Sequence, residues 1–374
     1  MSRSTPPSTN EFEISVIGPG RGECVLLHLG DNEWCVVDSC TARGRTESVA
    51  IEYLNSFENG ALDGVKIVVA THWHDDHIRG LASVLRRVPS ASFFCSAALD
   101  KEIFFELVGI TANGIQGRSG VDEFAAILGL IGDSAAEKTL RLATPKWAIE
   151  NRKLLDLIGV DRTFSATVTA LSPSDGTLAL AYTEIAQVLP KTGDIQRRIT
   201  NLSPNHTSVV LWVEAGPMRA LLGADLLHTG HAGEGWGAVL SCKRDETAAF
   251  FKVPHHGSAN ADCPEVWDQM LRENPIAVVT PFTSGVPLPK SSDLLRLAGR
   301  TTNCYCTTAG AGKAPSRDAV VEKTMRRQVT ERRVVEGAPG HVRVRWSLTD
   351  QMANPVVELF NGAHPVTIDA RATL

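Results

Sequence analysis

A buried strand that runs directly into a dense histidine–aspartate cluster is the feature that most constrains this chain. Residues 65–70, VKIVVA, form a nearly continuous β-branched run, which is typical of a strand covered on both faces. Residues 72–77, HWHDDH, then place three histidines and two aspartates in six positions. Loops usually draw on Ser, Gly and Asn instead. Because His72 and His74 are two apart in an extended chain, their side chains point the same way and can reach one metal.

Further candidate ligands lie at the ends of other strands along the chain. They are Asp38, His206, Asp225, His255 and His256. Each one alone is more often a cap or a surface residue. Together they lie at strand ends, where α/β folds expose functional groups, so they predict the second half of one metal site. Asp76 and His77 follow a turn and can face a second metal beside the first. Imidazole nitrogens and carboxylate oxygens are ligands that zinc accepts.

The pattern of apolar runs predicts a layered α/β protein. Runs at 11–18, 24–30 and 33–39 predict a β-meander, and the runs around Gly216 predict a hairpin. Residues 98–160 are predicted to be mostly helical from apolar residues at three-to-four spacing. The Gly-rich stretches GPGRGE (18–23) and GAGKA (310–314) lack the context of phosphate-binding loops and are predicted to be turns.

Domain boundaries follow from the same runs. We expect a disordered lead over 1–11 and a main domain over 12–308, with 98–160 as a helical insertion. A basic C-terminal extension over 309–374 is expected to end in strands that pack on the same domain.

Composition narrows the functional classes. The net charge of −5 gives no global basic field, so a nucleic-acid site would have to be a local patch. No apolar run approaches the ~18 residues that span a membrane, and the start of the chain lacks the apolar core of a secretory signal. The eight cysteines include no C-x-x-C pair, which indicates reduced thiols. We therefore expect a cytoplasmic protein without a membrane association.

The order H-x-H-x-D-H, His, Asp and a final His resembles the metallo-β-lactamase superfamily over residues 12–308. The resemblance implies a four-layer αββα sandwich with two divalent metal ions along one edge, zinc being expected and manganese the alternative. It implies that His72, His74 and His206 bind one metal. Asp76, His77 and one histidine of the 255–256 pair would bind the other, and Asp225 would bridge the two. Asp38 matches the family's first-motif aspartate, which orients ligands.

The segment KVPHHGSAN (252–260) resembles the H-H-G-S signature of the domain attached to bacterial DNA-uptake (competence) channels and of its soluble relatives. Those relatives imply nuclease or phosphodiesterase activity. H-G-S also resembles the H-S-T pattern of RNA-processing nucleases, which favours His256 as the metal ligand and leaves His255 as a general acid or phosphate contact. Ser258 and Asn260 could donate hydrogen bonds to a substrate, or could simply fix the turn.

The implied reaction is hydrolysis by a water shared between two cations about 3.5–4 Å apart, whose pKa falls toward ~7. Asp76 would steer the nucleophile or accept its proton. Several basic side chains favour a phosphate substrate, although charge runs are usually solvated faces. They are Lys191, Arg197, Arg198, Lys252 and the five basic residues of KTMRRQVTERR (323–333).

Three functional hypotheses follow from these residues. We predict a metal-dependent phosphodiesterase or nuclease acting on nucleic acid. The alternative is a small-molecule hydrolase of a thioester, a lactone or a phosphocholine-type ester. A non-catalytic binding subunit is least favoured, because every expected ligand is present. A protein partner or a homo-oligomer is also open.

Overall fold

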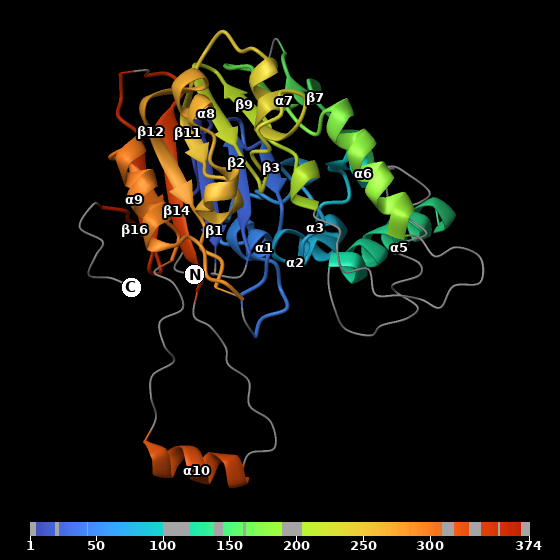
Figure 1. Ribbon diagram of the computed structural model, residues 1–374, viewed down its shortest axis with the longest axis vertical. Coiled ribbons are helices and arrows are strands. Elements are labelled where there is room, and N and C mark those ends of the chain that lie inside the picture. Colours follow the sequence, from blue (N-terminus) through green and yellow to red (C-terminus); the bar gives the residue numbers. More distant parts are fainter. Residues whose placement is uncertain are drawn as a thin grey trace.

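The fold consists of two eight-stranded sheets with helices on their outer faces (Figure 1). This computed structural model describes residues 5–18, 22–42, 44–99, 120–137, 145–159, 162–188, 204–283, 285–308, 318–328, 338–350 and 352–367.

The first sheet has the order β15-β14-β1-β2-β3-β4-β5-β6. Its strands are β1 (Glu11–Gly18), β2 (Cys24–Leu29), β3 (Trp34–Val37), β4 (Val65–Ala70), β5 (Ser92–Ser96), β6 (Lys146–Ala148), β14 (Gly340–Ser347) and β15 (Val356–Phe360). The predicted meander is present as β1, β2 and β3, which pair antiparallel in turn. From β3 to β6 the pairing is parallel.

The second sheet has the order β16-β13-β12-β11-β10-β9-β8-β7. Its strands are β7 (Arg152–Leu157), β8 (Ala166–Ala170), β9 (Leu211–Ala215), β10 (Met218–Leu222), β11 (Ala248–Lys252), β12 (Leu271–Val279), β13 (Cys304–Cys306) and β16 (His364–Pro365). The predicted hairpin joins β9 to β10 through Gly216, whose φ of 50° is accessible to glycine at little cost. From β10 to β13 the pairing is parallel. Of the C-terminal strands, β14 and β15 belong to the first sheet and β16 to the second.

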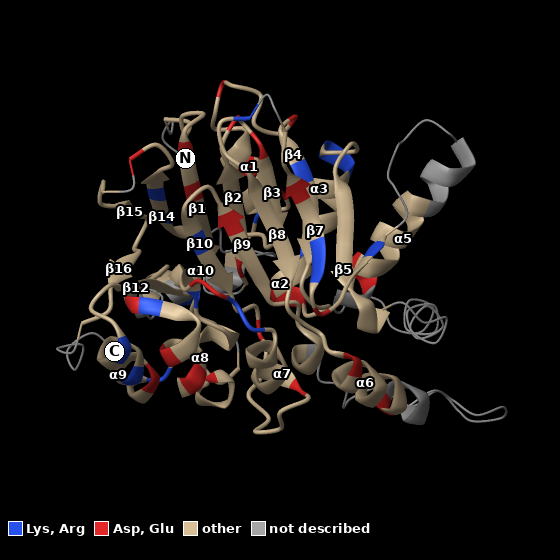
Figure 2. Cartoon of the chain, turned by 90° about the horizontal axis from the view of Figure 1, so that it is seen from above, with Lys and Arg blue, Asp and Glu red and all other residues tan. Residues whose placement is uncertain are grey.

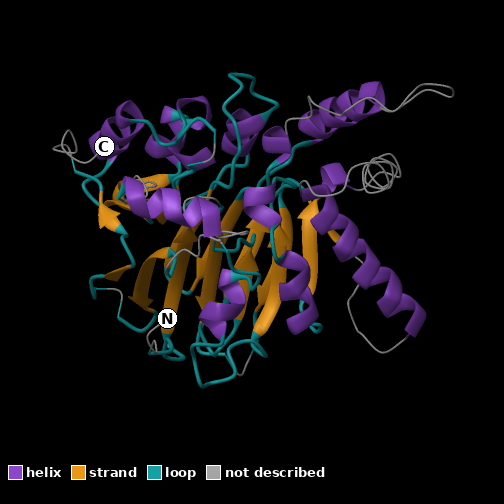
Figure 3. Cartoon of the chain, turned by 90° about the horizontal axis from the view of Figure 1, so that it is seen from below, coloured by secondary structure: helices purple, strands orange, loops and turns teal. Residues whose placement is uncertain are grey.

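Helices cover both outer faces. The described helices are α1 (Val49–Leu54), α2 (Asp75–Ile78), α3 (Leu81–Arg87), α5 (Gly120–Glu137), α6 (Asp175–Val188), α7 (Gly235–Ser241), α8 (Pro264–Gln269), α9 (Ser291–Arg300) and α10 (Ala319–Gln328), of which α10 lies apart from the sheets. Short 3-10 turns are η1 (Ala97–Leu99), η2 (Pro204–Thr207), η3 (His255–Gly257) and η4 (Ala259–Ala261). Figure 3 shows the helices lying over the strands.

Three apolar cores separate four layers. The central core joins residues of both sheets, such as Val69 of β4 and Leu211 of β9. A second core packs α1, α3 and α5 against the first sheet, and a third packs α7, α8 and α9 against the second sheet. The alternation of strand side chains between two faces produces this layering, because each sheet buries both of its faces. The predicted αββα sandwich is confirmed.

The helical prediction over 98–160 is wrong for part of its length. Gly120–Glu137 is helical as expected, but Lys146–Ala148 and Arg152–Leu157 are strands. The spacing of Leu154, Leu155 and Leu157 fits a helix face, yet β7 pairs antiparallel with β8, so non-local pairing overrides the local pattern. Residues 100–119 and 138–144 lie outside the described residues. The predicted lead falls partly outside them too, and β1 already begins at Glu11.

The parallel strands of the two sheets end at a common edge. The chain leaves β3 at Asp38 and β4 at Thr71, and it leaves β10 just before Asp225. The amide of Val209 donates to the carbonyl of Thr71 (3.0 Å), and the hydroxyl of Ser96 donates to the carbonyl of Thr207 (2.7 Å). These bonds join the two sheets where their strands end, which is where the predicted ligands lie.

Two expectations concern the rest of the chain. No helix among the described residues is both long and apolar enough to cross a membrane. The basic segment 323–333 falls partly in α10, which Figure 1 shows apart from the two sheets, and partly outside the described residues.

Candidate metal centre

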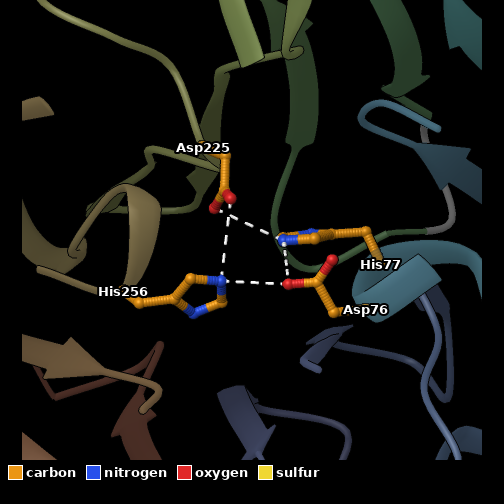
Figure 4. A group of neighbouring side chains, drawn as sticks. All are labelled: Asp76, His77, Asp225 and His256. Carbon is orange, nitrogen blue, oxygen red and sulfur yellow. Dashed lines mark hydrogen bonds and ion pairs between the residues drawn. The ribbon is translucent and has the colours of Figure 1, made fainter. Parts of the chain in front are cut away.

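Six predicted ligands from three distant segments converge at the common edge of the sheets. Asp76, His77, Asp225 and His256 have ligand atoms within 4.8 Å of one another, and Figure 4 shows the four side chains pointing into one space. His72, His74 and Asp225 form a second such group. Asp225 belongs to both groups, so the arrangement offers two adjacent cation sites that share one carboxylate.

Three of the imidazoles are held so that Nε2 faces this space. His77 Nδ1 donates to Asp38 Oδ2 (2.7 Å), and His256 Nδ1 donates to the carbonyl of Thr280 (2.9 Å). The hydroxyl of Thr71 donates to Asp38 Oδ2 (2.7 Å) and therefore accepts from His72 Nδ1 (3.0 Å). With each Nδ1 carrying its proton, the neutral ring leaves a lone pair on Nε2, which is the form that binds a metal.

The side chains fit cations because nitrogen and oxygen atoms that can bind a metal face one another at short range. His77 Nε2 lies 3.3 Å from Asp225 Oδ1, and neither buried atom has a hydrogen-bond partner. His72 Nε2 lies 3.2 Å from His74 Nδ1. Such contacts are costly in a buried site unless a cation or a proton lies between the atoms.

Burial and charge determine the protonation of the site when no cation is present. Burial by itself would lower the pKa of His77, but Asp225 and the other nearby carboxylates outweigh it and raise that pKa well above 6.5. The pKa of His256 is raised in the same way, chiefly by Asp225 against the effect of burial. Burial instead lowers the pKa of His72 well below 6.5, and the neighbouring His77 lowers it further.

Asp38 lies beneath the ligands, as predicted from its place after β3. It is 2% exposed and has a φ of 60°. Its Oδ1 accepts from the amide of Thr71 (2.7 Å), and its Oδ2 accepts from the Thr71 hydroxyl and from His77. One carboxylate therefore orients two ligand-bearing residues.

Of the histidine pair after β11, His256 is the one in the ligand group. The ring of His255 is held on both sides, by Asn260 Oδ1 at Nδ1 (2.8 Å) and by Asn205 Nδ2 at Nε2 (3.1 Å). Asn260, predicted to contact substrate, thus positions His255 instead. The amide of Ser258 donates to the carbonyl of His255 (2.9 Å) and closes the turn.

Two predicted roles differ from the positions that the residues occupy. His206 is in neither ligand group and instead lines a hollow of about 230 Å³ beside α6, together with Glu184 and Glu234. Lys252, predicted to bind substrate, is 1% exposed and forms an ion pair with the carboxylate of Glu23. Lys252 is enclosed because β11 is covered on both faces. Lys191, Arg197 and Arg198 lie outside the described residues.

Sequence reasoning missed Glu23, Asn205 and Thr280. Glu23 lies in the GPGRGE stretch that was predicted to be a turn, and its amide donates to the carbonyl of Asp76 (2.9 Å). Asn205 immediately precedes His206, and Thr280 follows β12. Polar residues directly after a buried strand, or beside a predicted ligand, were the signals that could have found them.

Comparison with known proteins bears on the first half of the site. Residues 17–147 match the family model described as the metallo-beta-lactamase superfamily. This segment therefore resembles a metallo-β-lactamase superfamily domain. The matched region contains Asp38 and the cluster at 72–77. Asp225 and His256 lie outside it and come close to the cluster only in the folded chain. Among curated proteins, none matches this chain.

Solved structures similar to the chain include the metallo-beta-lactamase fold protein YhfI from Bacillus subtilis, at 14% identity and a TM-score of 0.32 over 64% of this chain and 70% of that one. A metallo-beta-lactamase mutant from Cronobacter sakazakii is similar at 13% identity and a TM-score of 0.32, over 66% of this chain and 77% of that one. A subclass B3 metallo-beta-lactamase from a soil metagenome library is similar at 13% identity and the same TM-score, over 70% and 83%.

Proposed function

We propose that this chain is a metal-dependent hydrolase that uses two divalent cations, zinc first and manganese as the alternative. The observation that carries the proposal is the pair of ligand groups meeting at Asp225. One cation would be held by His72, His74 and Asp225, and the other by Asp76, His77, Asp225 and His256. His206, predicted as a further ligand of the first cation, is not needed for this arrangement.

Two cations held this way would lower the pKa of a water between them and polarise the oxygen of the scissile group. The chain's own residues prepare that chemistry. Asp38 and Thr71 fix the ring orientations of His77 and His72. Asp76, whose side chain is 14% exposed, is the most accessible carboxylate of its group and is placed to accept a proton from the nucleophile. The held ring of His255 borders the ligands and is placed to contact the substrate.

A phosphodiester is the first substrate class that we propose, with nucleic acid as its macromolecular form. Its support is the two-cation geometry, which suits in-line displacement at phosphorus, and the resemblance of the H-H-G-S loop to DNA-uptake channel domains. A second candidate is a small-molecule ester, thioester or lactone. The hollow lined by His206 favours it, because Glu184 and Glu234 would repel a phosphate backbone. Figure 2 shows acidic positions along α6 and α8.

The double variant His72→Ala/His74→Ala tests the hydrolase. Cations bound per chain would be counted by elemental analysis, and activity measured on DNA, RNA, bis-aryl phosphates, thioesters and lactones. We expect about two cations in the wild type, fewer in the variant, and loss of all activity. His364→Ala, which changes a histidine of the edge strand β16, should match the wild type. Turnover of carbonyl substrates with inert phosphodiesters would refute the substrate class, and a wild type without bound cations would refute the hydrolase.

A further inference from the structure

The buried ion pair between Glu23 and Lys252 lies directly behind the ligand group that contains His77 and His256. Both side chains are at most 2% exposed, and they come from segments 229 residues apart in the chain. A charged pair at this depth loses its hydration, so packing alone does not account for its presence. Glu23 Oε1 lies 3.8 Å from His77 Nδ1, and Oε2 lies 3.9 Å from His256 Nδ1.

Hydrogen bonds from this pair reach three segments that carry ligands. The Glu23 amide donates to the carbonyl of Asp76 (2.9 Å). Glu23 Oε2 accepts from the hydroxyl of Thr280, whose carbonyl in turn accepts from His256 Nδ1. Lys252 Nζ donates to the carbonyl of Ala224 (3.3 Å), the residue before Asp225.

The backbone at these contacts has strained dihedral angles. Ala224 has a φ of 45° and His256 a φ of 52°, both in the left-handed region that non-glycine residues avoid. The carbonyl of Ala224 accepts from Lys252 Nζ and also from the amide of His255 (3.0 Å). The ion pair thus secures the two strained turns that present Asp225 and His256.

We infer that Glu23 and Lys252 are positioning residues that set the geometry, and hence the cation affinity, of the group formed by Asp76, His77, Asp225 and His256. This inference rests on the proposed function. Among the described residues, no hydrogen bond or ion pair joins Glu23 or Lys252 to His72 or His74, and Asp225 is the ligand that the two groups share. Their removal should therefore weaken one cation site selectively.

The double variant Glu23→Gln/Lys252→Met is the main test, since it removes both charges while keeping nearly the same volume and leaves neither charge unpaired. Zinc would be titrated calorimetrically into metal-free protein to obtain the two stepwise dissociation constants. The Tm of the metal-free form would be measured as well, and both measurements compared with those of the wild type. We expect one of the two constants to weaken about 10–100-fold, as for other residues that orient ligands, with the other constant unchanged. Glu23→Asp, which keeps the charge but shortens the reach, should weaken the same constant.

Glu13→Gln/Arg345→Met is the matched control, because it removes another buried ion pair (2.7 Å) that joins β1 to β14 away from the ligands. This control should lower Tm without changing either constant. Wild-type constants in the Glu23/Lys252 variant, or equal weakening of both, would overturn the inference and leave the proposed function intact. A wild type that binds no zinc would overturn both.

Discussion

Replacement of Asp38 by Asn tests whether the carboxylate beneath the ligands controls cation binding. Asp38 accepts three hydrogen bonds of 2.7 Å, one at Oδ1 from the Thr71 amide and two at Oδ2 from the Thr71 hydroxyl and His77 Nδ1. An amide cannot satisfy all three. If its NH2 group replaces Oδ1, it faces the N–H of Thr71. If it replaces Oδ2, it faces His77 Nδ1–H and favours the tautomer that carries its proton on Nε2, the ligand atom.

Either orientation leaves a buried donor unsatisfied, which costs about 1–3 kcal/mol of folding free energy. The loss in affinity for the second cation should be about 10–100-fold, equivalent to about 1.4–2.7 kcal/mol. Zinc titration of the metal-free protein and its thermal unfolding measure the two effects. Asp268→Asn, at a side chain that is 71% exposed, makes the same chemical change and should alter neither. Wild-type zinc affinity in Asp38→Asn would refute the reasoning.

Three other predictions follow from individual residues. His206→Ala should keep two bound cations and raise KM, as the residue lines the hollow rather than a ligand group; loss of one cation would contradict this. Gly22→Ala should lower both Tm and zinc affinity, because a Cβ there would lie 2.5 Å from the carbonyl oxygen of Asp76 at a φ of 146°. A wild-type Tm and zinc affinity in this variant would show that the loop can shift without cost. Burial lowers the pKa of His28 to about 4, below its unfolded value. The neutral ring therefore stabilises the fold above pH 6.5, and up to ~3 kcal/mol of folding free energy is lost as the pH falls toward 4. Urea unfolding at pH 7.5 and pH 5 should show a smaller difference in His28→Gln than in the wild type, and an equal difference would count against this assignment.

The ligands that come together in the centre share one property, which is that each lies in the segment that follows an apolar strand. Asp38 and Asp225 were predictable because strand ends in α/β folds gather at one edge, whichever sheet they come from. The length of the second sheet was not predictable. β7 pairs with β8, which in turn pairs with β9, and this tertiary pairing rather than the spacing of Leu154 and Leu155 makes the segment a strand.

Lys252 shows why a basic residue near a predicted ligand is a weak indicator of phosphate binding. Its position four residues before His256 suggested a surface contact, but all five residues of β11 are buried. A lysine is tolerated there because Glu23 pairs with it. Glu23 comes from a glycine-rich stretch that matched no known phosphate loop. The partner of a buried charge therefore becomes visible only once the fold brings the two segments together.

The buried charges around the centre explain why the ligands occur together with the charged residues that orient them. Four carboxylates and one lysine are buried or nearly buried there, namely Glu23, Asp38, Asp76, Asp225 and Lys252. Their formal charge is strongly negative, and a low-dielectric site tolerates this only with compensating positive charge. In the metal-free protein protons on His77 and His256 supply it, which is why those pKa values are raised although burial opposes this. Two divalent cations would displace these protons and compensate the same carboxylates, so the surplus of buried acid is itself an argument that the centre is built for metal.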